Sequence, residues 1–298
     1  MQATNHFPLS GIIGVVSESL DEIKLATDNK LRCVEIRADL LLDLGLSLND
    51  LISAVEQSKA LGLGTLVTLR HPDQGGKFKG SEQERVAINR QVLVAGADLI
   101  DLEWGSEAAR ELLAQKAPMI LSNHDFNAMP SPAELASLTQ NMLSEGPWAI
   151  KIVPTASTLE DAARMLSWVN QSQARSVQSS HGIHRIGFAM GSAGACSRIL
   201  TTAFGGPVTY TSFGKPVAPG QIALSDLIKV YRVMQLNQQS TVTAVVGTTA
   251  FTSEAVTELN MRYQSTGDNK IAIAFAGQSE RDLEPFKADL RISEVYSH

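Results

Sequence analysis

The sequence predicts an α/β protein: a (β/α)8 TIM barrel followed by a small C-terminal β-α-β-α appendage. Eight short apolar runs rich in β-branched residues recur along most of the chain, and most gaps between them carry helical patterns. Apolar runs that alternate with helices are typical of parallel strands covered on both faces, and eight such units favour a closed barrel. The runs are I-I-G-V-V at 12–16, C-V-E-I-R at 33–37, T-L-V-T-L-R at 65–70, D-L-I-D-L-E-W at 98–104, M-I-L-S-N-H at 119–124, A-I-K-I-V at 149–153, R-I-G-F-A-M at 185–190 and P-V-T-Y-T-S at 207–212.

The helical patterns lie between these runs. One follows Pro130 as S-P-A-E-L-A-S-L-T-Q-N-M-L, with Ser131 as the cap, proline in the first turn and Glu134 three residues after the serine. Another begins at Ser157. A doubly wound open sheet is the main alternative arrangement, but no G-x-G-x-x-G motif follows the first run to support dinucleotide binding.

The last part of the chain has a different character. A helical run from Leu224 to Met234 ends at the polar stretch 235–241, which predicts a barrel at 1–236 and an appendage at 242–298. A unit this short cannot bury both faces of a parallel sheet, so we expect it to dock on the barrel or on a second copy of itself. The appendage reads as a strand T-A-V-V-G, a helix around 253–263, a strand K-I-A-I-A-F-A and a helix from Glu280.

Composition and charge exclude several classes of function. A formal charge of −6 and a pI near 5.6 leave no general basic surface for nucleic acid or an anionic membrane. The two cysteines, Cys33 and Cys196, give neither a disulfide framework nor a metal-ligand spacing. The sequence has no long apolar run, and the N-terminal M-Q-A-T-N-H-F-P does not have the features of a signal peptide. We therefore expect a cytoplasmic protein.

The lysine in A-I-K-I-V-P-T-A, residues 149–156, is the most unusual charge in the sequence. Lys151 lies in a strand whose neighbours all prefer to be out of water. An ammonium buried without a partner is costly, and loss of its proton leaves a nucleophilic amine. A lysine at a strand end can instead extend its charged head back to water. This residue alone does not decide between the two.

Other polar residues end neighbouring strands, where the active site of a (β/α)8 barrel gathers. A neutral lysine adds to a ketone and forms an imine, which acidifies the adjacent C–H bond. The arginines would favour the neutral lysine and grip a carboxylate, and the histidine would move the proton. The set therefore suggests imine-assisted elimination or aldol chemistry on a small hydroxylated keto acid. Its members are Glu35, Arg37, Arg70, Glu103, His124, Asp125, Lys151, Arg198 and, after the last run, Gln221.

Each of these residues also has a structural interpretation. Salt bridges at the barrel rim would account for Arg37 and Arg70, with Glu35 or Asp39 as partners, and Glu103 would be another such partner. The glycine-rich turn M-G-S-A-G before the last arginine could form a phosphate-binding turn, and that arginine could cap backbone carbonyls. The ordered set as a whole makes these interpretations jointly less favourable than a shared site.

Six motifs in order resemble the type I 3-dehydroquinate dehydratase family. The similarity runs from about residue 10 to residue 235. It implies a (β/α)8 barrel, a homodimer, and the dehydration of 3-dehydroquinate to 3-dehydroshikimate without a cofactor or a metal. The motifs are V-E-I-R-A-D, T-L-R-H-P-D-Q-G-G-K-F-K-G, S-N-H-D-F, I-K-I-V-P-T-A, M-G-S-A-G-A-C-S-R and A-P-G-Q-I.

The resemblance also implies residue roles. Lys151 would form the imine with the substrate ketone, and His124 would be the general base and acid. Arg198 would hold the carboxylate of the substrate. Gln221, in the lid G-K-P-V-A-P-G-Q, would close over the ring and exclude water. The residues that would shape and bind the hydroxyl side are Glu35, Arg37 and Arg70.

Two positions depart from the family pattern. Val217 stands where the lid has a serine that contacts substrate, and Gln74 stands where a glutamate orients the histidine. Glutamine can accept a hydrogen bond from imidazole but cannot stabilise imidazolium as a carboxylate does. We expect a weaker dehydratase or one with a changed substrate. An imine-forming aldolase and a barrel that binds without turnover are the other hypotheses.

Residues 242–298 resemble the start of shikimate dehydrogenase, as it follows the dehydratase in the plant bifunctional enzyme. In V-V-G-T-T-A-F-T-S-E-A-V-T-E-L-N, three residues match: Gly247, Ser253 and Asn260. Ala255 and Leu259 replace a serine and a histidine of that family. The later lysine–aspartate pair and the nucleotide-binding domain are absent, so we expect neither redox activity nor NADP binding. An unrelated appendage for packing or dimerisation is the alternative.

Overall fold

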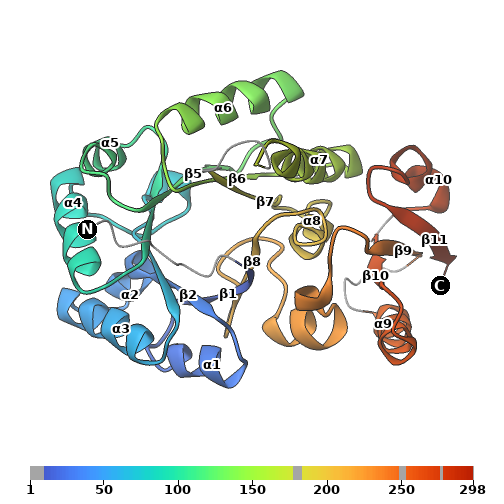
Figure 1. The fold of residues 1–298 in the computed structure, drawn as a ribbon, viewed down its shortest axis with the longest axis horizontal. Helices are drawn as coiled ribbons and strands as arrows, with labels where there is room; N and C mark the ends of the chain where they lie inside the picture. The colour runs from blue at the N-terminus through green and yellow to red at the C-terminus, as the bar shows by residue number, and fades with distance from the viewer. Residues whose placement is uncertain (1–9, 177–182, 248–252, 276–277, 298) are drawn as a thin grey trace.

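The computed structural model describes residues 10–176, 183–247, 253–275 and 278–297. The N-terminal segment M-Q-A-T-N-H-F-P, and T-T-A-F-T in the segment compared with shikimate dehydrogenase, lie outside the described residues. Eight parallel strands form one barrel in the order β7-β6-β5-β4-β3-β2-β1-β8 (Figure 1). Each of the eight expected strands is present, and the open doubly wound alternative is excluded. The strands are β1 Gly11–Val16, β2 Cys33–Arg37, β3 Gly64–Thr68, β4 Leu99–Glu103, β5 Met119–Asp125, β6 Ala149–Pro154, β7 His184–Gly187 and β8 Val208–Ser212.

Helices cover the outside of the barrel. The capped helix start expected at Ser131 is confirmed: its side chain accepts from the backbone N–H of Glu134, whose carboxylate accepts from the backbone N–H of Ser131. Ser47 and Ser81 cap their helices in the same way. The helices are α1 Glu22–Asp28, α2 Ala38–Asp43, α3 Leu48–Ala60, α4 Glu82–Val94, α5 Glu107–Ala114, α6 Pro132–Ser144, α7 Leu159–Ser176 and α8 Ala195–Leu200, with a 3-10 turn η1 at Pro72–Gln74.

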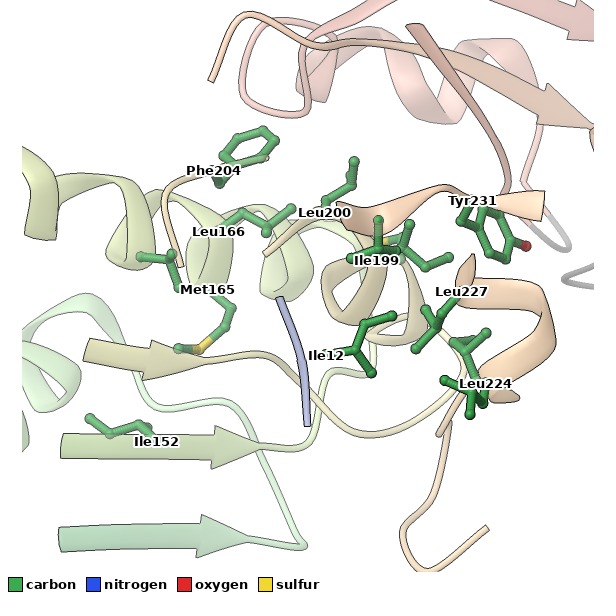
Figure 2. Packing of buried hydrophobic residues seen from close by; sticks show 14 of the residues in the cluster. Ile12, Ile152, Met165, Leu166, Ile199, Leu200, Phe204, Leu224, Leu227 and Tyr231 are labelled. Carbon is green, nitrogen blue, oxygen red and sulfur yellow. The ribbon is translucent and has the colours of Figure 1, made fainter. Parts of the chain in front are cut away.

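Alternate strand residues face two different cores. Ile13 and Val15 of β1 belong to a cluster inside the barrel, whereas Ile12 and Val16 belong to the larger cluster between strands and helices. Figure 2 shows part of this outer cluster, in which Ile12, Ile199 and Leu227 come from three different elements. Both cores hold the strand ends in place, and the strand ends carry the polar residues.

The run from Leu224 to Met234 is not the regular helix that its sequence pattern indicates. It forms a π-helical turn η2 at Asp226–Val230 and a 3-10 turn η3 at Val233–Gln235. Arg232 between them has φ 49°, in the left-handed region, which breaks the helix. The wide turn lets Leu227 and Tyr231 pack into the outer core.

The C-terminal unit contains one strand more than expected. Its three strands are parallel in the order β10-β9-β11. The last strand, I-S-E-V-Y-S, was missed because it lies at a sheet edge and is mostly exposed, so its apolar pattern is weak. The elements are β9 Thr241–Val246, α9 Glu254–Thr266, β10 Lys270–Ala274, α10 Glu280–Leu283, the 3-10 turn η4 Glu284–Phe286 and β11 Ile292–Ser297.

This unit docks on the barrel, next to α7 and α8 (Figure 1). Arg291, just before β11, reaches the loop that follows α8. Its guanidinium donates to the main-chain oxygens of Ala203 at 2.9 Å and Gln238 at 2.8 Å and lies 4.0 Å from the ring centroid of Phe204. One side chain thus joins the C-terminal unit to the segment after α8. Among the described residues, no helix is both long and apolar enough to cross a membrane.

Replacement of Arg291 by alanine is expected to lower the free energy of unfolding by about 1–3 kcal/mol, because two hydrogen bonds from a charged donor and a ring contact are lost. Chemical denaturation measures this. The exposed Arg281 on α10 provides the control, and Arg281→Ala should change little. Equal stabilities of the two variants would mean that Arg291 does not anchor the unit.

Candidate active site

A cavity of about 100 Å³ opens at the carboxyl ends of the barrel strands. It is lined by the seven residues to which the family resemblance gives a role, whereas Glu103 and Asp125 of the wider strand-end set do not line it. A wider hollow of about 430 Å³ lies between α6, α7 and η4, but no lysine or histidine among the described residues lines it. The smaller cavity is therefore the candidate active site. The seven residues are Glu35, Arg37, Arg70, His124, Lys151, Arg198 and Gln221.

Carboxylates, rather than the expected arginines, lie next to Lys151. The ammonium nitrogen is 3.1 Å from Oδ2 of Asp101 and 3.8 Å from Oε1 of Glu35. It also lies 4.3 Å from the ring centroid of Tyr210. The lysine is 5% exposed, so it does not extend to water. Two carboxylates and an aromatic face therefore hold the amine at the wall of the cavity.

Asp101 is the residue that the sequence interpretation missed. Its second oxygen accepts hydrogen bonds from Arg70 at 2.8 Å and from the hydroxyl of Ser122 at 2.6 Å. Burial alone would raise the pKa of this carboxyl, but the charges of Arg70 and Lys151 hold it well below its usual range. Asp101 is thus a permanent carboxylate that links Arg70 to Lys151.

The salt-bridge interpretation is correct for Arg37 and partly wrong for Arg70. Arg37 donates to both oxygens of Asp39, at 2.9 and 2.8 Å. Arg70 pairs with neither Glu35 nor Asp39; it bonds Asp101 and, at 3.0 Å, Glu103. Glu103 is indeed a partner in a salt bridge. Both arginines are thus held in fixed orientations at the cavity wall.

Gln74 holds the candidate base, His124. Its side-chain oxygen accepts from the backbone N–H of His124 at 3.0 Å and lies 3.3 Å from Nδ1 of the ring. Because this oxygen only accepts, Nδ1 carries the hydrogen and Nε2 is the basic nitrogen. Burial, reinforced by Arg70 and Lys151, lowers the pKa of His124 well below its ordinary value. The imidazole is therefore neutral in the cavity, with Nε2 unprotonated.

The loop that carries Gln74 requires glycine. A Cβ at Gly76 would lie 1.9 Å from the main-chain oxygen of Arg70, and Gly75 has φ 78°. Any larger residue would displace the loop. The pair of glycines therefore sets the position of the glutamine beside the histidine.

Arg198 is a buried cation with room for an anion. Its NH2 donates to the main-chain oxygen of Pro219 at 3.0 Å, and its guanidinium carbon lies 4.7 Å from the ring centroid of Phe188. Burial lowers its pKa to about 10. Among the described residues, no carboxylate pairs with it and no acceptor bonds its Nε. A buried charge of this kind favours an anionic ligand.

The lid, residues 214–221, is held over the cavity by hydrogen bonds of its own residues. The side-chain oxygen of Gln221 accepts from the backbone N–H of Val217 at 2.8 Å. The Val217 side chain packs against the cluster inside the barrel. Pro219 fastens the lid to Arg198. The valine that replaces the expected serine thus covers the cavity with apolar surface.

Comparisons with known proteins agree with this geometry. Residues 13–238 match the family described as type I 3-dehydroquinase. The chain is 30% identical over 210 residues to a 3-dehydroquinate dehydratase of Methanocaldococcus jannaschii, covering 68% of this chain and 87% of the relative. It is also 30% identical over 270 residues to the chloroplastic bifunctional 3-dehydroquinate dehydratase/shikimate dehydrogenase of Arabidopsis thaliana, covering 87% of this chain. This chain spans only 43% of the length of that relative.

Solved structures show the same fold. A 3-dehydroquinate dehydratase from Geobacillus kaustophilus superposes with a TM-score of 0.65 at 22% identity and covers 76% of this chain and 91% of its own. The dehydroquinate dehydratase and shikimate dehydrogenase from S. pombe superposes with a TM-score of 0.62 at 20% identity, covering 97% of this chain and 56% of its own. The family match spans the barrel and includes every residue of the cavity, so the chain belongs to the type I 3-dehydroquinase family, the 3-dehydroquinate dehydratases that act as hydro-lyases in the shikimate pathway.

Proposed function

We propose that this chain dehydrates 3-dehydroquinate through an imine on Lys151, with His124 as general base and acid. The observation that carries this proposal is a buried lysine in one small cavity with a neutral histidine and a buried arginine that has no carboxylate partner. The lysine supplies the nucleophile, the histidine the proton transfer and the arginine the grip on a carboxylate.

The steps conserve atoms and protons. The ammonium of Lys151 gives up one proton, and the resulting amine attacks the ketone carbon. The released proton returns as the adduct loses water, so the ammonium and the ketone give a protonated imine and one water. Nε2 of His124 removes a proton from the adjacent carbon, and the electron pair moves towards the imine nitrogen. The resulting enamine expels the hydroxyl group, which takes the proton back from His124 and leaves as water. Water then hydrolyses the imine and restores the lysine.

The surrounding charges suit these steps. Asp101 and Glu35 offer carboxylate oxygens to the lysine while it is protonated, and they stabilise the cationic imine that follows. Arg198 binds the substrate carboxylate. Arg37 and Arg70 shape the hydroxyl side, since carboxylates already fix both guanidiniums. Gln221 reaches the substrate when the lid rearranges around it.

A spectroscopic assay tests the proposal. The purified chain is mixed with 3-dehydroquinate, and the absorbance of the conjugated enone is followed. Turnover supports the dehydratase. Binding detected by calorimetry without any enone would instead support a barrel that keeps its binding site and works by binding alone, the alternative that Val217 and Gln74 favour.

Val217→Ser is expected to raise kcat/KM several-fold, because it restores one substrate hydrogen bond worth about 0.5–1.5 kcal/mol. Steady-state kinetics with 3-dehydroquinate measures the change. Val217→Ala is the matched control, since it removes the packing without adding a hydroxyl. If serine and alanine give the same loss, the lid has adapted to valine and the lost hydrogen bond is not what limits binding.

The oligomeric state and location extend the proposal. The family resemblance supports a homodimer in the cytoplasm. Light scattering on the purified chain tests the dimer: the mass of a single 32.0 kDa chain at micromolar concentration would contradict it.

We propose further that residues 242–298 are a degenerate remnant of shikimate dehydrogenase without redox activity. Support comes from the match to the bifunctional relative, which extends over 270 residues, and from the fold similarity over 97% of this chain. Two of the three matching residues make hydrogen bonds that stabilise the unit's own fold. Asn260 exchanges two hydrogen bonds with the backbone of Ala272, and Ser253 caps α9 by accepting from the backbone N–H of Val256.

Titration calorimetry with NADP⁺ and with shikimate should show no binding to this remnant. A shikimate-dependent rise in NADPH absorbance would overturn the proposal and assign the unit a second activity.

A further inference from the structure

Arg85 is a buried cation outside the cavity. It lies on α4, is fully buried, and does not line the pocket that holds Lys151. Its guanidinium donates to the main-chain oxygen of Leu69 at 3.0 Å, to Glu82 at 3.1 Å and to Glu103. A cation removed from water in this way needs strong partners, and one of them, Glu103, also bonds Arg70 of the cavity wall.

A chain of contacts leads from Arg85 to the lysine. One oxygen of Glu103 accepts from Arg85, and the other accepts from Arg70 at 3.0 Å. Arg70 donates in turn to one oxygen of Asp101 at 2.8 Å. The other oxygen of Asp101 lies 3.1 Å from the nitrogen of Lys151. Every link joins opposite charges, so loss of the charge on Arg85 would change the ion pairing of Lys151.

The charges in this buried set balance only with Arg85. Three cations face three carboxylates, and each of the six side chains is at most 6% exposed. Without Arg85, the set would carry one excess negative charge. In the low-dielectric interior, that charge would interact strongly with the neighbouring cations. The cations are Lys151, Arg70 and Arg85, and the carboxylates are Glu35, Asp101 and Glu103.

We propose that Arg85 is a positioning residue for the reaction, acting through Glu103 and Arg70 on the carboxylate that holds Lys151. Because Arg85 neutralises Glu103 through one carboxylate oxygen, Arg70 can bond both the other oxygen of Glu103 and Asp101. Without Arg85, Glu103 draws Arg70 to itself. Asp101 then loses the hydrogen bond from Arg70 and pairs more strongly with the ammonium of Lys151. The amine is therefore less available to the substrate ketone. This inference rests on the proposed function.

The test compares Arg85→Met, Arg85→Lys, Glu103→Gln and the double variant Arg85→Met/Glu103→Gln. For each variant, kcat, KM, the thermal midpoint and the rate of borohydride trapping at saturating 3-dehydroquinate are measured. Arg85→Met is expected to lower kcat and the trapping rate about 10- to 100-fold and to leave KM within about threefold, since only the geometry of the reacting amine is disturbed. Arg85→Lys should restore most of the loss, because its charge still neutralises Glu103.

The double variant separates positioning from simple support of the fold. If Arg85 acts through Glu103, adding Arg85→Met to Glu103→Gln lowers kcat by less than about threefold. This comparison still decides when Arg85→Met alone is too unstable to purify. Arg90→Met provides the control on the same helix, since Arg90 is half exposed and pairs with Glu111 away from the site.

The outcomes are distinct from those of the dehydratase assay. No turnover by the wild-type chain would overturn the proposed function itself. Turnover by the wild type together with unchanged kcat and trapping in a folded Arg85→Met variant would overturn the role of Arg85 alone. Additive losses in the double variant would mean that Arg85 merely supports the fold.

Discussion

Lys151→Ala is expected to lower kcat by about 10⁴-fold or more, because the reaction loses the covalent intermediate that turns a ketone into an electron sink. The cavity itself should remain, since the lysine contributes little apolar packing beyond its contact with Tyr210. Removing a buried cation leaves Asp101 with Arg70 and Ser122 as partners, so the variant should still fold. We expect the variant to form almost no enone in the absorbance assay and still to bind 3-dehydroquinate in calorimetry.

The control for this prediction is a lysine near the barrel rim. Lys79 is exposed and pairs with Asp43 at 2.9 Å, so Lys79→Ala should turn over like the wild type. Turnover of Lys151→Ala within tenfold of the wild type would contradict catalysis through an imine on Lys151.

His124→Ala is expected to lower kcat by about 10²–10⁴-fold, the usual contribution of a positioned acid–base group. The imine should still form, because its formation needs the amine of Lys151 rather than the imidazole. Borohydride should therefore still trap substrate on the variant, while enone formation is severely slowed. Rapid-quench trapping and enone absorbance, measured on the same sample, separate the two steps.

A second histidine serves as the control. His184, at the start of β7, is exposed and packs on Trp148, so His184→Ala should leave kcat unchanged. A His124→Ala variant that neither traps substrate nor turns over, in a folded protein, would mean that the histidine acts before the imine forms, contrary to the proposed order of steps.

Much of the barrel could be predicted because its signals are local. Each strand of the barrel is a short apolar run, and the cap at Ser131 is visible in four residues. The last strand of the C-terminal unit could not be found this way, since its residues face water at a sheet edge. The break near Arg232 depends on a backbone conformation that its side chain does not signal.

The candidate site likewise has features that the sequence predicts and features that it does not. Seven of the nine strand-end residues named from the sequence line one cavity because strand ends meet at one mouth of a barrel, which follows from the fold. Asp101 was missed because it lies within its strand rather than at the end. Its spacing from Glu103, two residues along the strand, places both on the same face and would have revealed it. The pairing of Arg70 with Asp101 and Glu103 depends on distances between strands, which the sequence does not contain.

Peptide mapping after borohydride reduction identifies the lysine that forms the imine. The wild-type chain is incubated with 3-dehydroquinate, reduced, digested and analysed by mass spectrometry. We expect one stable mass increment, on the peptide that contains Lys151, and none in the Lys151→Ala variant. An increment on a peptide containing Lys77, Lys79 or Lys215 instead, with Lys151 unmodified, would contradict it.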